Sequence, residues 1–184
     1  MKLVKQLKKL YPEYFWAVFG STALKMYDQS QAFQYQKEEK LKGLKPKDID
    51  VVTNAKICSG AFKDLLEMLD DVVQIDQANE GKYPIECINK RITVHMASGE
   101  VYDFIFVRLD TAKEWLEEQF SIYTQCIIEC PLCPGEDGTI TSMSFRQAYT
   151  LGAFPKSGEV RISRHCTPAH RQKIERIKQA LINQ

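Results

Sequence analysis

The sequence contains no run of about 18 apolar residues, so no segment reaches the length of a membrane-spanning helix. Residues 1–15 are basic and lack the apolar stretch and small-residue cleavage site of a secretion signal, so we expect a first helix there and a cytoplasmic protein. No internal repeat or low-complexity tract occurs. With 44% hydrophobic and 27% charged residues, the 184-residue chain is expected to form one globular domain with a short appendage.

The chain also has little net charge, but the charge is unevenly distributed. The formal net charge is +1, with +6 on residues 1–47, −10 on residues 48–155 and +5 on residues 156–184. Two basic ends around an acidic centre suit a polyanionic partner such as RNA that reaches toward an acidic, metal-loaded pocket. Terminal helices that carry lysine and arginine for solubility explain the pattern equally well.

Hydrophobic periodicity predicts a mixed α/β (α+β) domain with one main sheet flanked by helices. Helices are expected over 2–11, 21–36 (with Ser21 or Thr22 as N-cap), 60–70, 111–120 and from Thr167-Pro168 to the end, and strands over 15–20, 48–54, 83–89, 91–97, 101–107 and 126–130. Asn89-Lys90 and Ser98-Gly99 are expected to form turns, residues 37–47 an exposed loop, and residues 139–152 a return to helix. We divide the chain into a core, 1–120, and a C-terminal extension, 121–184, which ends in a basic helix.

Three features along this pattern can carry chemistry. Gly20-Ser21 stands where a buried strand meets a helix, a place where glycine lets the backbone approach a phosphate and the helix N-terminus offers free N–H groups. Asp48 and Asp50 alternate on one face of the next strand, where two carboxylates repel each other unless a cation such as Mg²⁺ lies between them. Alone, each of these two features is common in proteins without such a function.

Asp103 is the third feature, and it decides the interpretation. It lies in the apolar strand VYDFIFV, where an unpaired charge is costly, so participation in a metal site is the favoured explanation. A buried salt bridge to Arg91 or Arg108 is the competing one.

In order, spacing and strand context, these residues resemble the DNA polymerase beta-like nucleotidyltransferase superfamily over residues 15–107. The chain departs from compact members by a longer segment between Ser21 and Asp48. The resemblance implies a Mg²⁺-dependent enzyme in which Asp48 and Asp50 bridge two Mg²⁺ ions and Asp103 holds one of them and accepts the acceptor's proton. It also implies that Gly20, Ser21 and Lys25 bind the triphosphate of a nucleoside triphosphate such as ATP, although an outward-pointing Lys25 is equally compatible.

The expected reaction is transfer of a nucleoside monophosphate to a hydroxyl acceptor, with an RNA or tRNA 3′ end favoured by the basic termini. Transfer to a small molecule or a protein, as in antibiotic-modifying or toxin-like relatives, is the alternative enzyme hypothesis. A nucleotide- or RNA-binding module without catalysis is the alternative from another class, and the retention of all three acids argues against it.

The six cysteines suggest a second site. In a reducing cytosol they are expected as thiols or metal ligands, not disulfides. Cys130 and Cys133 have the spacing of a zinc knuckle, and Cys166 with His170, or His165 with His170, could complete a zinc site. Free thiols are the alternative.

Overall fold

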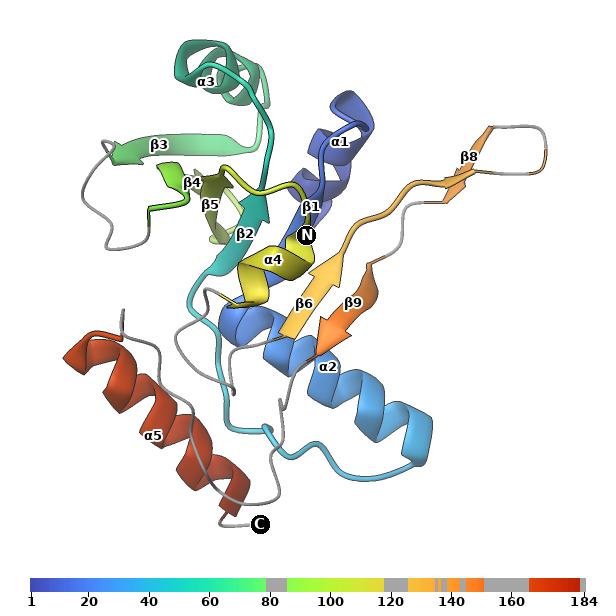
Figure 1. Ribbon diagram of the computed structural model, residues 1–184, viewed down its shortest axis with the longest axis vertical. Coiled ribbons are helices and arrows are strands. Elements are labelled where there is room, and N and C mark those ends of the chain that lie inside the picture. Colours follow the sequence, from blue (N-terminus) through green and yellow to red (C-terminus); the bar gives the residue numbers. More distant parts are fainter. Residues whose placement is uncertain are drawn as a thin grey trace.

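The computed structural model describes residues 1–78, 86–117, 126–134, 136, 139–142, 145–150 and 166–182. A seven-stranded mixed sheet in the order β3-β4-β5-β2-β1-β6-β9 forms its centre (Figure 1). The helices are α1 (Lys2–Leu10), α2 (Gly20–Tyr35), α3 (Ser59–Glu67), α4 (Ala112–Glu117) and α5 (Pro168–Ile182). The strands are β1 (Trp16–Phe19), β2 (Ile49–Thr53), β3 (Val72–Ala78), β4 (Ile88–Met96), β5 (Val101–Val107), β6 (Cys126–Glu129), β7 (Cys133–Pro134), β8 (Ile140–Ser142) and β9 (Arg146–Thr150).

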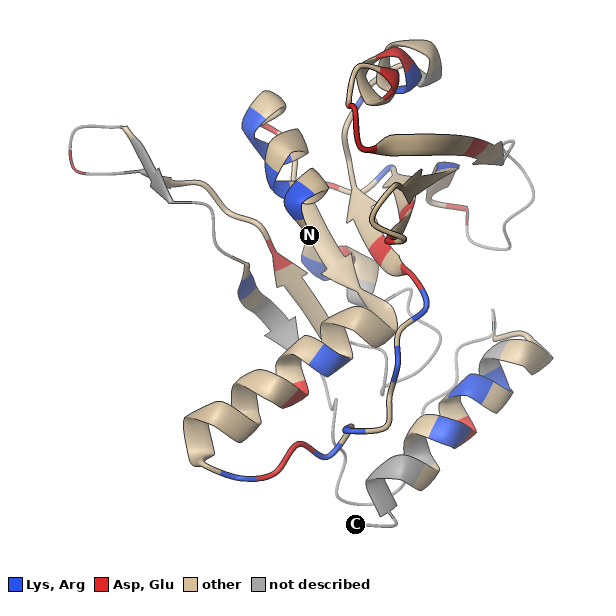
Figure 2. Ribbon diagram, turned by 180° about the vertical axis from the view of Figure 1, so that it is seen from behind, with Lys and Arg blue, Asp and Glu red and all other residues tan. Residues whose placement is uncertain are grey.

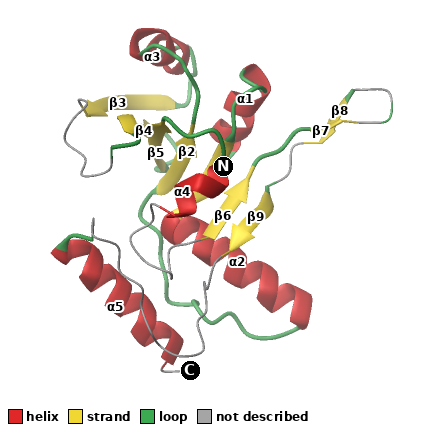
Figure 3. Ribbon diagram, viewed as in Figure 1, coloured by secondary structure: helices red, strands yellow, loops and turns green. Residues whose placement is uncertain are grey.

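Helices cover both faces of this sheet, as the secondary-structure colouring makes clear (Figure 3). On one face, Leu3 and Leu7 of α1 and Phe62 of α3 pack against the sheet residues Trp16 and Phe104 in one buried cluster. On the other face, Trp115 of α4 packs edge-on against Phe19, with ring centroids 5.3 Å apart, in a second cluster. The predicted α/β architecture is therefore confirmed.

A third buried cluster packs the C-terminal helix α5 against earlier parts of the chain. Ile174 and Ile177 of α5, one turn apart, pack against Leu24 of α2 and Leu41 of the segment between α2 and β2. All four side chains are at most 2% exposed. This contact places α5 beside α2 and that segment.

Several sequence-based predictions of local structure were wrong. Strand β3 was not predicted, and Asn89-Lys90 lies inside β4, where a bulge opposite β5 replaces the predicted turn. Residues 146–150 form β9, which pairs with β6, where a helix was predicted. Ser21 and Thr22 do not cap α2: the helix starts at Gly20, its N-cap is Phe19, and no side-chain cap is made.

The predicted C-terminal extension contributes strands to the central sheet. β6 pairs with β1 through Ala17 opposite Glu129 and Val18 opposite Ile128, and β9 extends the sheet beyond β6. Within the described residues, no helix combines the length and apolar character needed to cross a bilayer.

Candidate active site

Two parallel strands place the three predicted aspartates together. β2 and β5 pair in parallel with Asp50 opposite Asp103, so the two side chains project from the same face of the sheet. Asp48 directly precedes β2. One carboxylate oxygen of each aspartate lies within 4.8 Å of the others. Among the described residues this is the one group of three or more acidic, histidine or cysteine side chains with metal-binding geometry.

The junction between β1 and α2 lies directly against this group of aspartates. β1 runs antiparallel to β2 with Phe19 opposite Asp50, which brings Gly20 against the aspartates. Gly20 has φ +68°, and a Cβ there would lie 2.5 Å from Asp50 Oδ2. Both the backbone conformation and the close approach therefore require glycine at position 20.

Burial and charge together raise the pKa of Asp50 to about 7. Desolvation is the largest cause, and the negative charges of Asp48 and Asp103 add to it, whereas Lys173 and Arg91 act in the opposite direction. Such a carboxylate is stabilised in its charged form by a cation placed among the three acids.

The carboxylate of Asp103 is oriented by two side chains of β4. The Arg91 guanidinium forms an ion pair with Asp103 Oδ2, and the Thr93 hydroxyl donates to Asp103 Oδ1 at 2.5 Å. Asp103 is only 4% exposed. The salt bridge to Arg91 and the aspartate cluster, which the sequence presented as alternatives, are therefore both present, whereas Arg108 hydrogen-bonds to Asn89.

Thr93 was missed by the sequence reasoning, although a signal for it existed. It alternates with Arg91 along β4 and stands directly opposite Asp103 in the antiparallel register. Thr22 was interpreted only as a helix cap, but its hydroxyl donates to the backbone carbonyl of Asp48 at 2.8 Å. That bond ties the first turn of α2 to the residue that begins the acidic cluster.

The first turn of α2 faces the aspartates through Gly20, and its backbone N–H groups have no partners within the helix. Ser21, the predicted phosphate ligand beside Gly20, is buried. A helix N-terminus next to a cation site is suited to a phosphate chain because the N–H groups and the helix dipole favour negative charge.

Lys25, which was predicted to bind nucleotide, is engaged elsewhere. Its ammonium group donates to Glu39 Oε2 at 2.6 Å and to the Leu41 carbonyl at 2.7 Å. The structure thus directs this side chain to the segment 37–47, and a contact with phosphate stays a prediction.

The cysteines predicted to bind zinc lie on different parts of the fold. Cys130 belongs to the cluster under α1, whereas Cys166 packs against the cluster that fastens α5. Among the described residues, Cys130, Cys133 and Cys166 do not form a metal-binding group. The His170 side chain and all of His165 lie outside the described residues. Zinc therefore stays a prediction, and no disulfide joins the described cysteines.

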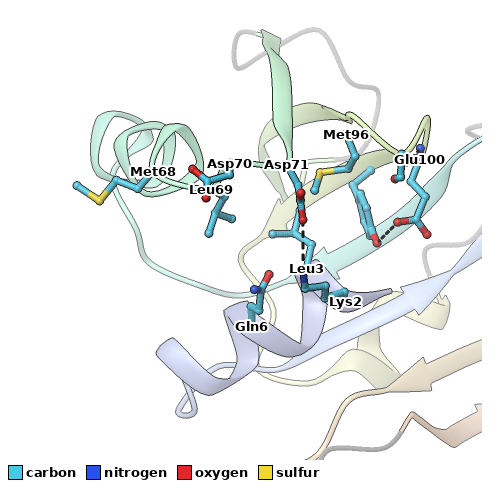
Figure 4. A pocket seen from close by; sticks show the side chains of 11 residues that line it. Lys2, Leu3, Gln6, Met68, Leu69, Asp70, Asp71, Met96 and Glu100 are labelled. Carbon is cyan, nitrogen blue, oxygen red and sulfur yellow. Dashed lines mark hydrogen bonds and ion pairs between the residues drawn. The ribbon is translucent and has the colours of Figure 1, made fainter.

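Two hollows of the described surface lie away from the predicted site residues. A cavity of about 460 Å³ lies between the start of α1, the end of α3 and the β4–β5 turn, and the Lys2–Asp71 ion pair crosses it (Figure 4). A second hollow, of about 800 Å³, lies at the far ends of β2 and β5, next to Lys90 and Arg108.

Comparison with solved structures finds CCA-adding enzymes. An apo form of a CCA-adding enzyme aligns with 95% of this chain and 37% of its own, at 13% identity and a TM-score of 0.52. A CCA-adding enzyme in complex with CTP aligns with 88% of this chain and 33% of its own, at 16% identity and a TM-score of 0.50. The Thermotoga maritima CCA-adding enzyme complexed with tRNA aligns with 76% of this chain and 27% of its own, at 16% identity and a TM-score of 0.45.

These similarities show the fold: the chain has a nucleotidyltransferase-like fold. It spans about a third of the length of the CCA-adding enzymes. No protein-family model and no curated protein matches the sequence.

Proposed function

We propose that this protein is a Mg²⁺-dependent nucleotidyltransferase that transfers a nucleoside monophosphate from a nucleoside triphosphate to a hydroxyl acceptor. The observation that carries the proposal is the meeting of Asp48, Asp50 and Asp103 within 4.8 Å beside the glycine-started helix α2. The fold shared with CCA-adding enzymes supports the same reaction class.

The residues present fit Mg²⁺. Three carboxylates offer the oxygen ligands that this cation prefers, and substrate phosphates and water complete its shell. The pKa of Asp50 is raised by burial and by the neighbouring acids, so a cation placed among the three carboxylates would favour its charged form. When bound, Mg²⁺ would supply charge neutralisation for the phosphates and a lowered pKa for the acceptor hydroxyl.

The chain's own residues would provide the positioning. The N–H groups of the first turn of α2 would donate to the triphosphate, and Gly20 leaves the space for it to approach. Arg91 and Thr93 would hold Asp103 in one orientation, and the Thr22 bond would hold the backbone at Asp48. In the reaction, a bond forms between the acceptor oxygen and the α-phosphorus while the α–β phosphoanhydride bond breaks, pyrophosphate leaves, and the hydroxyl proton passes to a base.

The acceptor class is decided by experiment. The purified chain is incubated with each α-³²P-labelled nucleoside triphosphate and Mg²⁺ in the presence of total RNA, protein or small-molecule hydroxyl compounds. We expect label on RNA 3′ ends, with tRNA as the favoured acceptor. Label on protein or on a small molecule instead would identify the alternative acceptor within the same reaction class.

Asp50→Asn is the test variant for catalysis and Asp76→Asn its matched control, because Asp76 is an exposed aspartate on β3, paired with His95. Loss of one metal-binding carboxylate is expected to lower the transfer rate on the order of 10²-fold or more, by analogy with the loss of one preorganised electrostatic group. Transfer that persists at the wild-type rate in Asp50→Asn would contradict the assignment of the site.

A further inference from the structure

Residues 37–47, the segment between α2 and β2, are held in place by hydrogen bonds to α2 and by apolar contacts with α5. Asp28 of α2, only 2% exposed, accepts hydrogen bonds from the backbone N–H groups of Lys40 at 3.0 Å and Leu41 at 2.6 Å. Lys25 donates to the Leu41 carbonyl, and the fully buried Leu41 side chain packs against α5. A charged loop held at this many points has a fixed path on the surface.

This anchoring leaves the segment with exposed positive charge. Its two acids are engaged, since Glu39 pairs with Lys25 at 2.6 Å and Glu38 with Lys42 at 3.6 Å. Lys37, Lys45 and Lys47 are exposed. On the adjoining α5, Arg171, Lys173 and Arg176 are exposed as well, with Glu175 between them. Figure 2 shows lysine and arginine on both α5 and this segment.

The segment 37–47 also leads back along the molecule to the aspartates. α2 begins at the acidic cluster with Gly20 and carries the chain about 24 Å away over its 16 residues. Residues 37–47 return the chain over the same distance and end directly at Asp48. Lys173 of α5 precedes Ile174, which packs against Leu24 close to the start of α2 at Gly20. The positive charges therefore line a path that leads to the candidate active site.

Two aromatic rings stand at the far end of this path. Phe33 is 90% exposed and Tyr35 is 57% exposed, and the Lys37 ammonium lies 6.0 Å from the centroid of the Tyr35 ring. The exposed Tyr35 ring beside Lys37 combines the two contacts that hold single-stranded nucleic acid, stacking on bases and attraction to phosphates, and Phe33 adds a second exposed ring on α2.

We propose that Phe33, Tyr35 and the lysines of residues 37–47, together with Lys173, form a binding track for a single-stranded nucleic-acid acceptor whose 3′ hydroxyl lies at Asp48, Asp50 and Asp103. This inference rests on the proposed function and names the surface that presents the acceptor to it. A path of this length accommodates about four nucleotides of extended strand. The rings bind bases without sequence preference, because every base has a π face.

The test measures binding without catalysis. A 3′-deoxy, fluorescein-labelled RNA of eight nucleotides cannot accept a nucleotide, and its affinity for the full chain is read by fluorescence anisotropy at several salt concentrations. We expect Phe33→Ala with Tyr35→Ala to weaken binding about 30-fold or more, which is about fivefold or more for each lost stacking contact. We expect Lys45→Gln with Lys47→Gln to weaken it and to reduce the salt slope by about 0.7 for each lost phosphate contact.

Matched controls lie on the opposite end of the molecule. Val73→Ala removes an exposed apolar side chain of β3, and Lys63→Gln removes an exposed lysine of α3. Both controls are expected to bind the RNA like wild type. All the substituted track residues are exposed, so thermal unfolding of each variant should match that of wild type and loss of binding is not loss of fold.

The outcomes separate the track from the proposed function. Asp50→Asn that binds the RNA but transfers no label supports both. RNA binding reduced by the track variants, with no transfer by wild type, upholds the track and contradicts the enzyme assignment. Wild-type affinity in both track variants overturns the track, whatever the transfer assay shows. Preference for double-stranded RNA, an acidic peptide or anionic phospholipid vesicles over the single strand also overturns it.

Discussion

At the scale of single residues, the site depends on a glycine that touches an aspartate. Gly20 combines φ +68° with a Cβ position 2.5 Å from Asp50 Oδ2, whereas Gly99 has φ +85° and open space around it. The two glycines therefore share a backbone conformation that disfavours side chains, but only Gly20 also approaches the acidic cluster.

We predict that Gly20→Ala lowers both the stability of the protein and its transfer rate. The left-handed conformation costs about 1 kcal/mol in either variant, and the contact with Asp50 adds strain only at position 20. Urea unfolding and the α-³²P assay measure the two effects. Gly99→Ala is the control: it should show the smaller loss of stability and a wild-type rate, and equal behaviour of the two variants would contradict the close approach.

Asp50 gives a second prediction at this scale. Its pKa in the folded protein is about 7, against 3.8 for an ordinary aspartate, so the folded state binds an extra proton between these values. The stability contributed by this group is fully present below pH 3.8 and is lost as the pH rises through 7. By this contribution the metal-free protein is less stable at pH 8 than in acid, by at most about 4 kcal/mol.

Asp50→Asn removes this dependence, because asparagine does not titrate. We predict that at pH 8 without metal the variant is more stable than wild type, although it has lost its function. Urea unfolding curves at pH 5, 6, 7 and 8 test this. A variant less stable than wild type at pH 8 would show that burial and the neighbouring acids do not disfavour the charged Asp50 carboxylate.

At the scale of elements, residues 37–47 connect α2 to α5 through hydrogen bonds to Asp28 and the apolar contacts of Leu41. Asp28→Asn keeps the shape of the side chain but replaces a charged acceptor of two backbone N–H groups by a neutral one, at a cost of about 1–3 kcal/mol. We predict faster amide hydrogen exchange at residues 40 and 41 and along α5 near Ile174. Exchange that is accelerated equally in α3, which lies at the other end of the molecule (Figure 1), would indicate general destabilisation instead.

The elements around the site were predictable because their patterns are local. The apolar run of β1 ends at a glycine. In β2 and β5, apolar residues surround the aspartates in patterns typical of strands. The strands and the acidic face could therefore be derived from the sequence. The parallel register of Asp50 with Asp103 was not derivable, since nothing local fixes which strand becomes the neighbour of β2.

The wrong predictions have long-range causes. Asn89-Lys90 has the composition of a turn, but pairing with β5 accommodates it as a bulge in β4, and Lys90 is buried with its ammonium 4.3 Å from the Phe106 ring centroid. Residues 146–150 become a strand because β6 offers a free edge, which outweighs their local preference. β3 carried a signal in Val72, Val73 and Ile75 that the sequence reasoning did not use.

At the scale of the whole molecule, two oppositely charged regions meet at one place. The acidic middle of the chain supplies the aspartates, the basic segment 37–47 ends directly before Asp48, and α5 packs against that segment. This arrangement matches a reaction in which a metal-bound triphosphate enters on the acids and a polyanionic acceptor approaches over the lysines. The chain shares its fold with CCA-adding enzymes and spans about a third of their length.

The most direct test of the account is the binding of Mn²⁺, a spectroscopic substitute for Mg²⁺, followed by electron paramagnetic resonance at pH 6 and pH 8. We predict that wild type binds the ion more tightly at pH 8, because the proton on Asp50 no longer competes. Asp50→Asn and Asp103→Asn should lose this binding, and the exposed Asp76→Asn should retain it. Wild-type Mn²⁺ affinity in both cluster variants would contradict the metal site and the enzyme assignment that depends on it.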